Sequence, residues 1–215
     1  MKKVADSAPI REALAEITGT HWVGVRFYKS RPGGMKISPP AAFCSAASKA
    51  ITEPALLRVA SIPCPGARYA FGVPGAVAPA LAAFAPARLG RLANMQAPAA
   101  GAQRLGFSPE YVGLNLPGAA DIYLSFMLNE SANELTQAWA AMTGRNLKTQ
   151  FTGVMSFCSE GAAAAFNGHR PAFSLGCARS IKAAGLQGQV CVCLPESQAR
   201  RFAKAWLREP SGAGV

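Results

Sequence analysis

Hydrophobic and polar positions alternate along the chain with two different periods, and each period predicts a kind of secondary structure. Apolar residues recur with the 3.6-residue period of a helix in three stretches: 7–18, 131–143 and 196–206. Runs rich in branched and aromatic residues predict three strands: 21–30, 120–129 and 188–195. We therefore expect an α/β (α+β) protein, with a mixed sheet and packed helices.

One short pattern occurs twice. Residues 43–50 read FCSAASKA and residues 157–164 read FCSEGAAA. Each copy follows a predicted strand (22–28 and 121–128) and precedes a second cysteine, 20 residues after Cys44 and 19 residues after Cys158. The repetition predicts an internal duplication with two similar halves related by a pseudo-twofold axis. Chance similarity in an alanine-rich chain is the alternative.

The duplication suggests how the chain divides. Residues 1–95 would form the first half-repeat, residues 96–104 a connector, and residues 105–215 the second half-repeat. The connector lies in a stretch rich in alanine, glycine and proline. We expect the two halves to make a single compact domain, because the length of 215 residues suits one large core.

The charge and the hydropathy of the chain indicate which kinds of partner the protein could bind. The formal net charge is +11, from 22 basic and 11 acidic residues, which suits an acidic protein partner. Basic residues are scattered and no nucleic-acid motif is present, so nucleic-acid binding is not expected. The long uncharged stretch 69–87 is interrupted by prolines, and the N-terminus has no apolar run. We expect a cytoplasmic protein that does not contact a membrane.

Four of the six cysteines stand where helices are predicted to begin: Cys44, Cys64, Cys158 and Cys177. In a reducing compartment, spaced cysteines bind metal or do chemistry more often than they form disulfides. Helix N-termini favour negative charge and the thiolate form, which is the form that ligates metal. Arg68 and Arg179 follow the second cysteine of each half and would add positive charge around a cofactor.

Four thiolates suit a [4Fe–4S] cluster or a zinc ion. Zinc sites usually show closely spaced ligand pairs, and neither half has a Cys-x-x-Cys, so the pattern favours iron–sulfur. The alternative without a cofactor is that the cysteines are small buried residues at tightly packed helix starts.

These segments also carry a family resemblance. The stretches IPCPGARYAFGV and FSLGCARSIKAAGL, with both FCS octads and VCVCLPESQARRF, resemble domain-of-unknown-function family 169, a group of uncharacterised prokaryotic proteins. The resemblance runs from about Gly24 to Trp206. It implies cysteines at the same four positions, and it implies no particular reaction.

The sequence leaves the biochemical role open between three classes. The first is an iron–sulfur protein in electron transfer, redox sensing or support of a redox enzyme. The second is a small-molecule-binding or catalytic protein, with Cys158 or Cys177 as the nucleophile and His169 as its helper. The third is a structural zinc protein. Cys191 and Cys193 share one face of a strand and are expected in the core, and Glu160 is a candidate helix cap or acid/base group.

Overall fold

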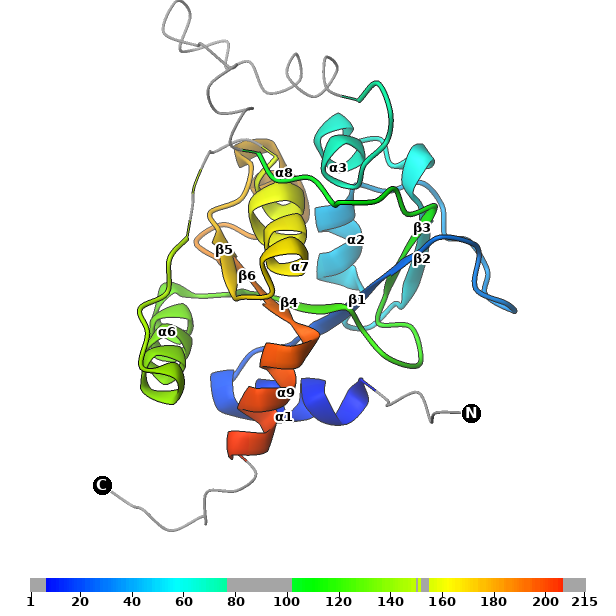
Figure 1. Cartoon of the computed structure of the whole chain (residues 1–215). Helices are drawn as coiled ribbons and strands as arrows, with labels where there is room; N and C mark the ends of the chain where they lie inside the picture. Colours follow the sequence, from blue (N-terminus) through cyan, green and yellow to red (C-terminus); the bar gives the residue numbers. More distant parts are fainter. Residues whose placement is uncertain (1–6, 77–101, 150, 152–154, 207–215) are drawn as a thin grey trace, which may run out of the picture.

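The computed structural model describes residues 7–76, 102–149, 151 and 155–206, without the side chains of 178–180 and 206. Its centre is a six-stranded sheet with the order β2-β3-β1-β4-β6-β5 (Figure 1). The strands are β1 (Val23–Tyr28), β2 (Ala55–Arg58), β3 (Tyr111–Leu114), β4 (Ile122–Met127), β5 (Ala172–Ser174) and β6 (Val190–Pro195). All five pairings between them are antiparallel.

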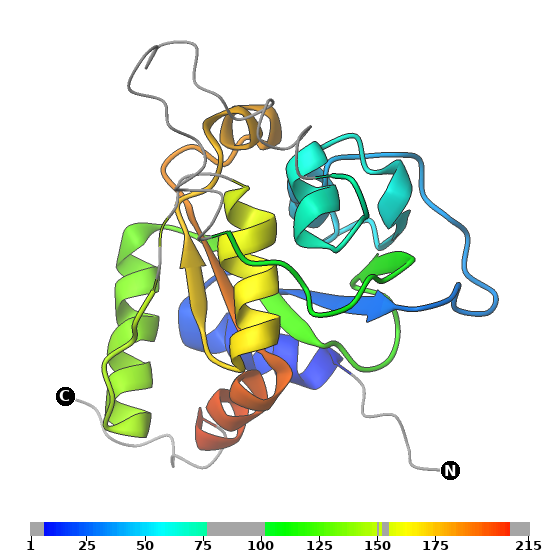
Figure 2. The same ribbon diagram turned by 45° about the horizontal axis from the view of Figure 1, so that its top comes forward.

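Helices cover both faces of this sheet, so the protein has three layers (Figures 1 and 2). One face carries α2 (Phe43–Lys49), α3 (Pro65–Ala70), the π-helix η3 (Phe157–Ala163) with α7 (Ala164–Gly168), and α8 (Ala178–Ala184). The other face carries α1 (Ala8–Thr18), α6 (Asn129–Thr143) and α9 (Glu196–Trp206). The short 3₁₀ turn η1 (Val59–Ser61) leads from β2 towards α3.

The central strands bury side chains on both faces, which is why their sequences are almost continuously apolar. On β4, Ile122 and Leu124 point into the core beneath α2 and η3, and Tyr123 points into the core over α1, α6 and α9. On β6, Cys191 and Cys193 face the first core and Val192 the second. Side chains that alternate between the faces of a strand therefore serve two separate hydrophobic cores.

The α/β class and the three predicted strands and three predicted helices are confirmed. The expectation of a mixed sheet is wrong, because every strand pairing is antiparallel. Strands β2, β3 and β5 were not predicted, since runs of three or four residues are too short to show a period. Helix α6 begins at Asn129 without a side-chain cap, so Ser131 does not start it.

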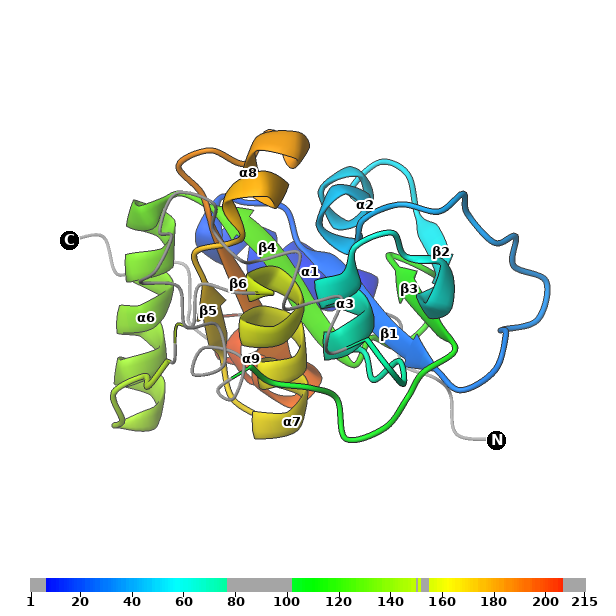
Figure 3. The same ribbon diagram turned by 90° about the horizontal axis from the view of Figure 1, so that it is seen from above.

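The strand order reads the same from either edge when β1, β2 and β3 are matched with β4, β5 and β6. This matching equates α2 with η3 and α3 with α8, because each lies between corresponding strands. The helices also pack in matched pairs, α2 on α8 and α3 on η3 (Figure 3). A twofold axis between β1 and β4 would give this arrangement, although the duplication itself stays a prediction.

By this symmetry, β3 belongs to the same half as β1 and β2. The predicted boundary at 96–104 instead assigns β3 to the second half. Residues 96–101 of that connector lie outside the described part of the chain. One sheet runs through both halves, and within the described residues no helix has the length and apolar character needed to cross a bilayer.

Asn115 fastens β1 to the end of α2, so we expect its replacement to destabilise the fold. Its Oδ1 accepts a hydrogen bond from Gly24 N and its Nδ2 donates one to Ala50 O, both at 2.7 Å. Asn115→Ala leaves both buried partners unpaired, and should lower the free energy of unfolding by about 2–4 kcal/mol in urea titrations. The exposed Asn146→Ala should change it by less than about 0.5 kcal/mol. A smaller effect at Asn115 would show that water replaces both bonds.

Candidate functional site

Four cysteines lie in the first turns of four helices on one face of the sheet. Cys44 is the second residue of α2 and Cys158 the second residue of η3, while Cys64 and Cys177 occupy the N-cap positions of α3 and α8. The prediction that each of them begins a helix is confirmed. Cys44, Cys158 and Cys177 are buried, and Cys64 is half-buried. None of the chain's cysteines is in a disulfide.

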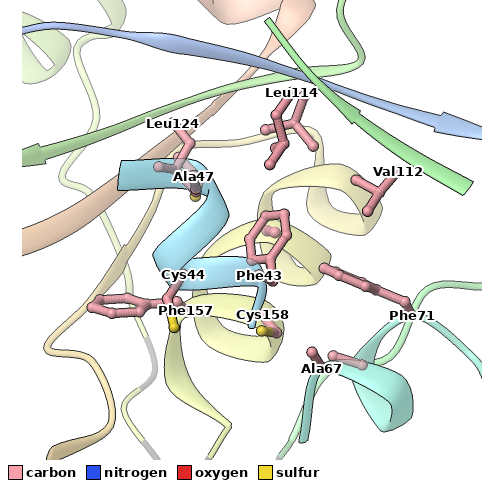
Figure 4. Packing of buried hydrophobic residues seen from close by; sticks show 14 of the residues in the cluster. Phe43, Cys44, Ala47, Ala67, Phe71, Val112, Leu114, Leu124, Phe157 and Cys158 are labelled. Atoms are coloured by element: carbon pink, nitrogen blue, oxygen red, sulfur yellow. The ribbon is translucent and has the colours of Figure 1, made fainter. Parts of the chain in front are cut away.

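The structure brings these four thiols into one neighbourhood. The sulfur atoms of Cys44 and Cys158 point the same way, away from the strands (Figure 4). Cys158 is the centre of the group, because its thiol interacts electrostatically with those of Cys64, Cys44 and Cys177. Residues that lie up to 133 positions apart in the sequence, such as Cys44 and Cys177, are thus gathered by the sheet order into one site.

The pKa of the Cys158 thiol is raised well above its ordinary value. Burial is the largest cause, and the neighbouring thiols of Cys64, Cys44, Cys177 and Cys193 add to it in that order. The expectation that the helix start would lower this pKa is therefore wrong, because burial removes the water that would stabilise the thiolate. Cys158 holds its proton at neutral pH unless a positive group binds beside it.

The segments that carry Cys158 and Cys177 are fixed to each other. The backbone N–H of Ser156 donates a hydrogen bond to Cys177 Sγ at 3.2 Å. Gly176 has φ +79, and a Cβ on it would lie 2.4 Å from the ring of Phe157, so the backbone before Cys177 packs directly on this ring. Phe157 in turn contacts Phe126 of β4, with ring centroids 5.2 Å apart.

The local backbone around Cys158 is unusual. Residues Phe157–Ala163 form a π-helix, a conformation that is rare and occurs often at functional sites. Met155, just before it, has φ +53 although it is not glycine. A Cβ on Gly161 would lie 3.1 Å from Cys193 Sγ, so the π-helix is seated closely on β6. These features indicate a segment shaped for a site and not for helix propensity alone.

Three polar atoms around this segment are buried without a hydrogen-bond partner among the described residues. They are Ser156 Oγ, Ser159 Oγ and Arg68 Nε. Two of them flank Cys158 in the sequence, and Arg68 is in the helix that begins after Cys64. Buried polar atoms are rarely left unpaired, so ordered water or another group is expected to pair with them. Arg179 is in α8, but its side chain lies outside the described residues.

The thiols do not crowd around a single point. Within the described residues, no three histidine, cysteine, aspartate or glutamate side chains lie close enough to share one metal ion. Tetrahedral zinc needs its four sulfur ligands about 3.8 Å apart, given Zn–S bonds of about 2.3 Å. The arrangement as it stands is therefore too open for one zinc ion.

The remaining candidates are placed away from this group or in the core. Cys191 and Cys193 are fully buried on β6, with sulfurs 3.8 Å apart, which confirms their core role. His169 is exposed just after α7, at the opposite end of the continuous η3–α7 segment from Cys158, about 15 Å along it. It cannot assist Cys158. Glu160 is buried and accepts a hydrogen bond from Ser174 Oγ at 3.1 Å, on the side of β5.

A protein-family model matches residues 17–205 and is described as "Uncharacterised ArCR". No curated protein and no solved structure matches the chain.

Two glycines with similar backbone angles provide a matched test of the packing at Cys177. Gly176→Ala would place a Cβ within 2.4 Å of Phe157, whereas a Cβ on Gly185 (φ +68) meets nothing within 4 Å. Both changes add backbone strain of about 1 kcal/mol, so the difference between them measures the clash. We expect Gly176→Ala to lower the free energy of unfolding by about 2 kcal/mol more than Gly185→Ala. Equal losses in urea titrations would show that the Phe157 ring moves aside.

Proposed function

The chain belongs to domain-of-unknown-function family 169, whose description specifies no reaction, and we propose from the site itself that the protein binds a [4Fe–4S] cluster. The ligands would be Cys44, Cys64, Cys158 and Cys177. The observation that carries the proposal is their convergence: four separate helix starts present four thiols on one face of the sheet, around Cys158.

Size distinguishes a cluster from a single zinc ion as the proposed occupant. A four-iron cluster is larger than one zinc ion, because each of its irons takes one thiolate and the ligands surround the whole cube. Its thiolates therefore lie farther apart than those of a zinc site. Thiols that share a neighbourhood but not a single ion-binding point suit this geometry.

The polar surroundings also suit an anionic cluster. Its iron would provide the positive charge that Cys158 needs to lose its proton in a buried position. Each proposed ligand stands at the start of a helix, where partial positive charge would favour a thiolate. The N–H of Ser156 already donates to Cys177 Sγ, and the unpaired donors of Ser156, Ser159 and Arg68 are available for sulfur atoms. Such donors tune the reduction potential of iron–sulfur clusters.

The role of such a cluster would be electron transfer, redox sensing or support of a larger redox enzyme. Cys64 is the most exposed of the four cysteines, so α3 marks the side on which a partner could approach most closely. The net charge of +11 suits an acidic redox partner. Free thiols throughout the chain suit the reducing cytoplasm, which we propose as its location.

Iron and sulfide analysis after anaerobic purification tests the proposal. We expect about four iron and four sulfide per chain, with the broad absorbance of an iron–sulfur protein near 400 nm. Serine at any one of Cys44, Cys64, Cys158 or Cys177 should lower the iron content at least severalfold, because each thiolate holds one iron.

Cys191→Ala and Cys193→Ala are the matched controls, since both thiols are buried nearby and are not among the proposed ligands. They should keep the iron content of the unmodified protein. Folded, metal-free protein would overturn the proposal. Zinc in place of iron would indicate the structural zinc alternative. If only the Cys191 and Cys193 variants lost iron, the proposed set of ligands would be wrong.

Alkylation separates the cluster proposal from the alternative with a cysteine nucleophile. A catalytic thiol needs a lowered pKa, whereas that of Cys158 is raised, so its thiolate fraction at neutral pH is below that of a free thiol. In metal-free folded protein, Cys158 should therefore react with iodoacetamide more slowly than in urea-unfolded protein. Its rate should continue to rise with pH beyond the point at which the rate of the unfolded protein levels off, because its pKa is raised by burial. Faster reaction in the folded state, found by peptide mapping, would favour the nucleophile.

A further inference from the structure

A cavity lies on the same face of the sheet as the four cysteines, between α2 and α8. It is a cleft of about 520 Å³, a size that suits a small organic ligand. Its lining residues come mainly from β1, β4, α2 and the end of α8. All of its lining residues are among the described ones, and none of the six cysteines is among them.

The lining combines an apolar base with a basic rim. Ile51, which is exposed, and the partly buried Phe126 provide apolar and aromatic surface. Lys49 and His21 are the basic side chains in the lining, and no carboxylate is among the lining residues. Serine hydroxyls complete the wall on α2, at Ser45 and Ser48. Such a lining suits a ligand with an aromatic body and one acidic group.

The equivalent space in the other helix pair is filled. Phe71 stands seven residues after Cys64, as Ala184 stands seven residues after Cys177. The Phe71 side chain is fully buried, and its ring centroid lies 5.4 Å from that of Phe27 and 4.9 Å from that of Phe43. Phe107 and Phe166 close the same region, 5.6 Å apart. At Ala184 no such ring is present, and the cleft remains open.

We propose that the cleft between α2 and α8 binds a small aromatic anion. The aromatic body would lie against Phe126 and Ile51, and the acidic group would face Lys49. The inference goes beyond the proposed cluster and does not depend on it, because the cleft contains none of the cluster ligands.

A pair of dyes tests both parts of this proposal by calorimetric titration of the full chain. 8-Anilinonaphthalene-1-sulfonate is an aromatic anion, and N-phenyl-1-naphthylamine is its uncharged analogue. We expect one molecule of either dye to bind per chain. Ala184→Phe should weaken both dyes at least tenfold, because the ring would fill the cleft as Phe71 fills its counterpart. Ala183→Trp, at an exposed position of the same helix, is a second way to fill it.

Substitution of the basic residue tests the charge. Lys49→Gln should raise the Kd of the sulfonate about threefold, as expected for one exposed ion pair, and leave that of the uncharged dye unchanged. The matched control is Lys182→Gln, an exposed lysine of α8 outside the lining, which should change neither. Absence of binding, or binding that survives both cleft-filling variants in folded protein, would overturn the site. If Lys49→Gln changed the Kd of the two dyes equally, the proposal that the cleft prefers an anion would be overturned.

Discussion

The burial of the Cys158 thiol among other thiols is the constraint on which the rest of the structure depends. Desolvation and four neighbouring cysteines keep this group protonated. The thiol is carried on a π-helix, which follows a non-glycine residue with positive φ and whose first residue, Phe157, packs against Gly176. Such costly features persist where a site requires them.

The sheet explains how distant cysteines meet. Because the order β2-β3-β1-β4-β6-β5 is symmetric about the β1–β4 pair, the helix after β1 and the helix before β5 lie on either side of the same centre. Each helix then packs on one from the other half, α2 on α8 and α3 on η3. The four first turns can converge only because the two halves are interleaved. A chain with two separate half-domains would keep Cys44 and Cys64 apart from Cys158 and Cys177.

The sequence predicted the helix starts well, because a cysteine followed by small residues and proline or serine carries local information. The order of the strands in the sheet cannot be predicted from such local patterns. β2, β3 and β5 have three or four residues each, and their pairing depends on contacts across the whole chain. The direction of the pKa shift at Cys158 could not be predicted either, because its main cause is burial. The sequence indicates where a helix begins but not how deeply its first turn is buried. The π-helix has no signature in FCSEGAAA that separates it from the α-helix of FCSAASKA.

The differences between the two halves are as informative as their similarity. One helix pair encloses Phe71 and its aromatic neighbours, and the other leaves a cleft beside Ala184. Phe126 lines that cleft, and its ring contacts Phe157, which adjoins Cys158. A molecule in the cleft and a cluster at the cysteines would therefore share one aromatic wall. The asymmetry between the halves therefore leaves an open cleft at Phe126, whose ring contacts the residue before Cys158.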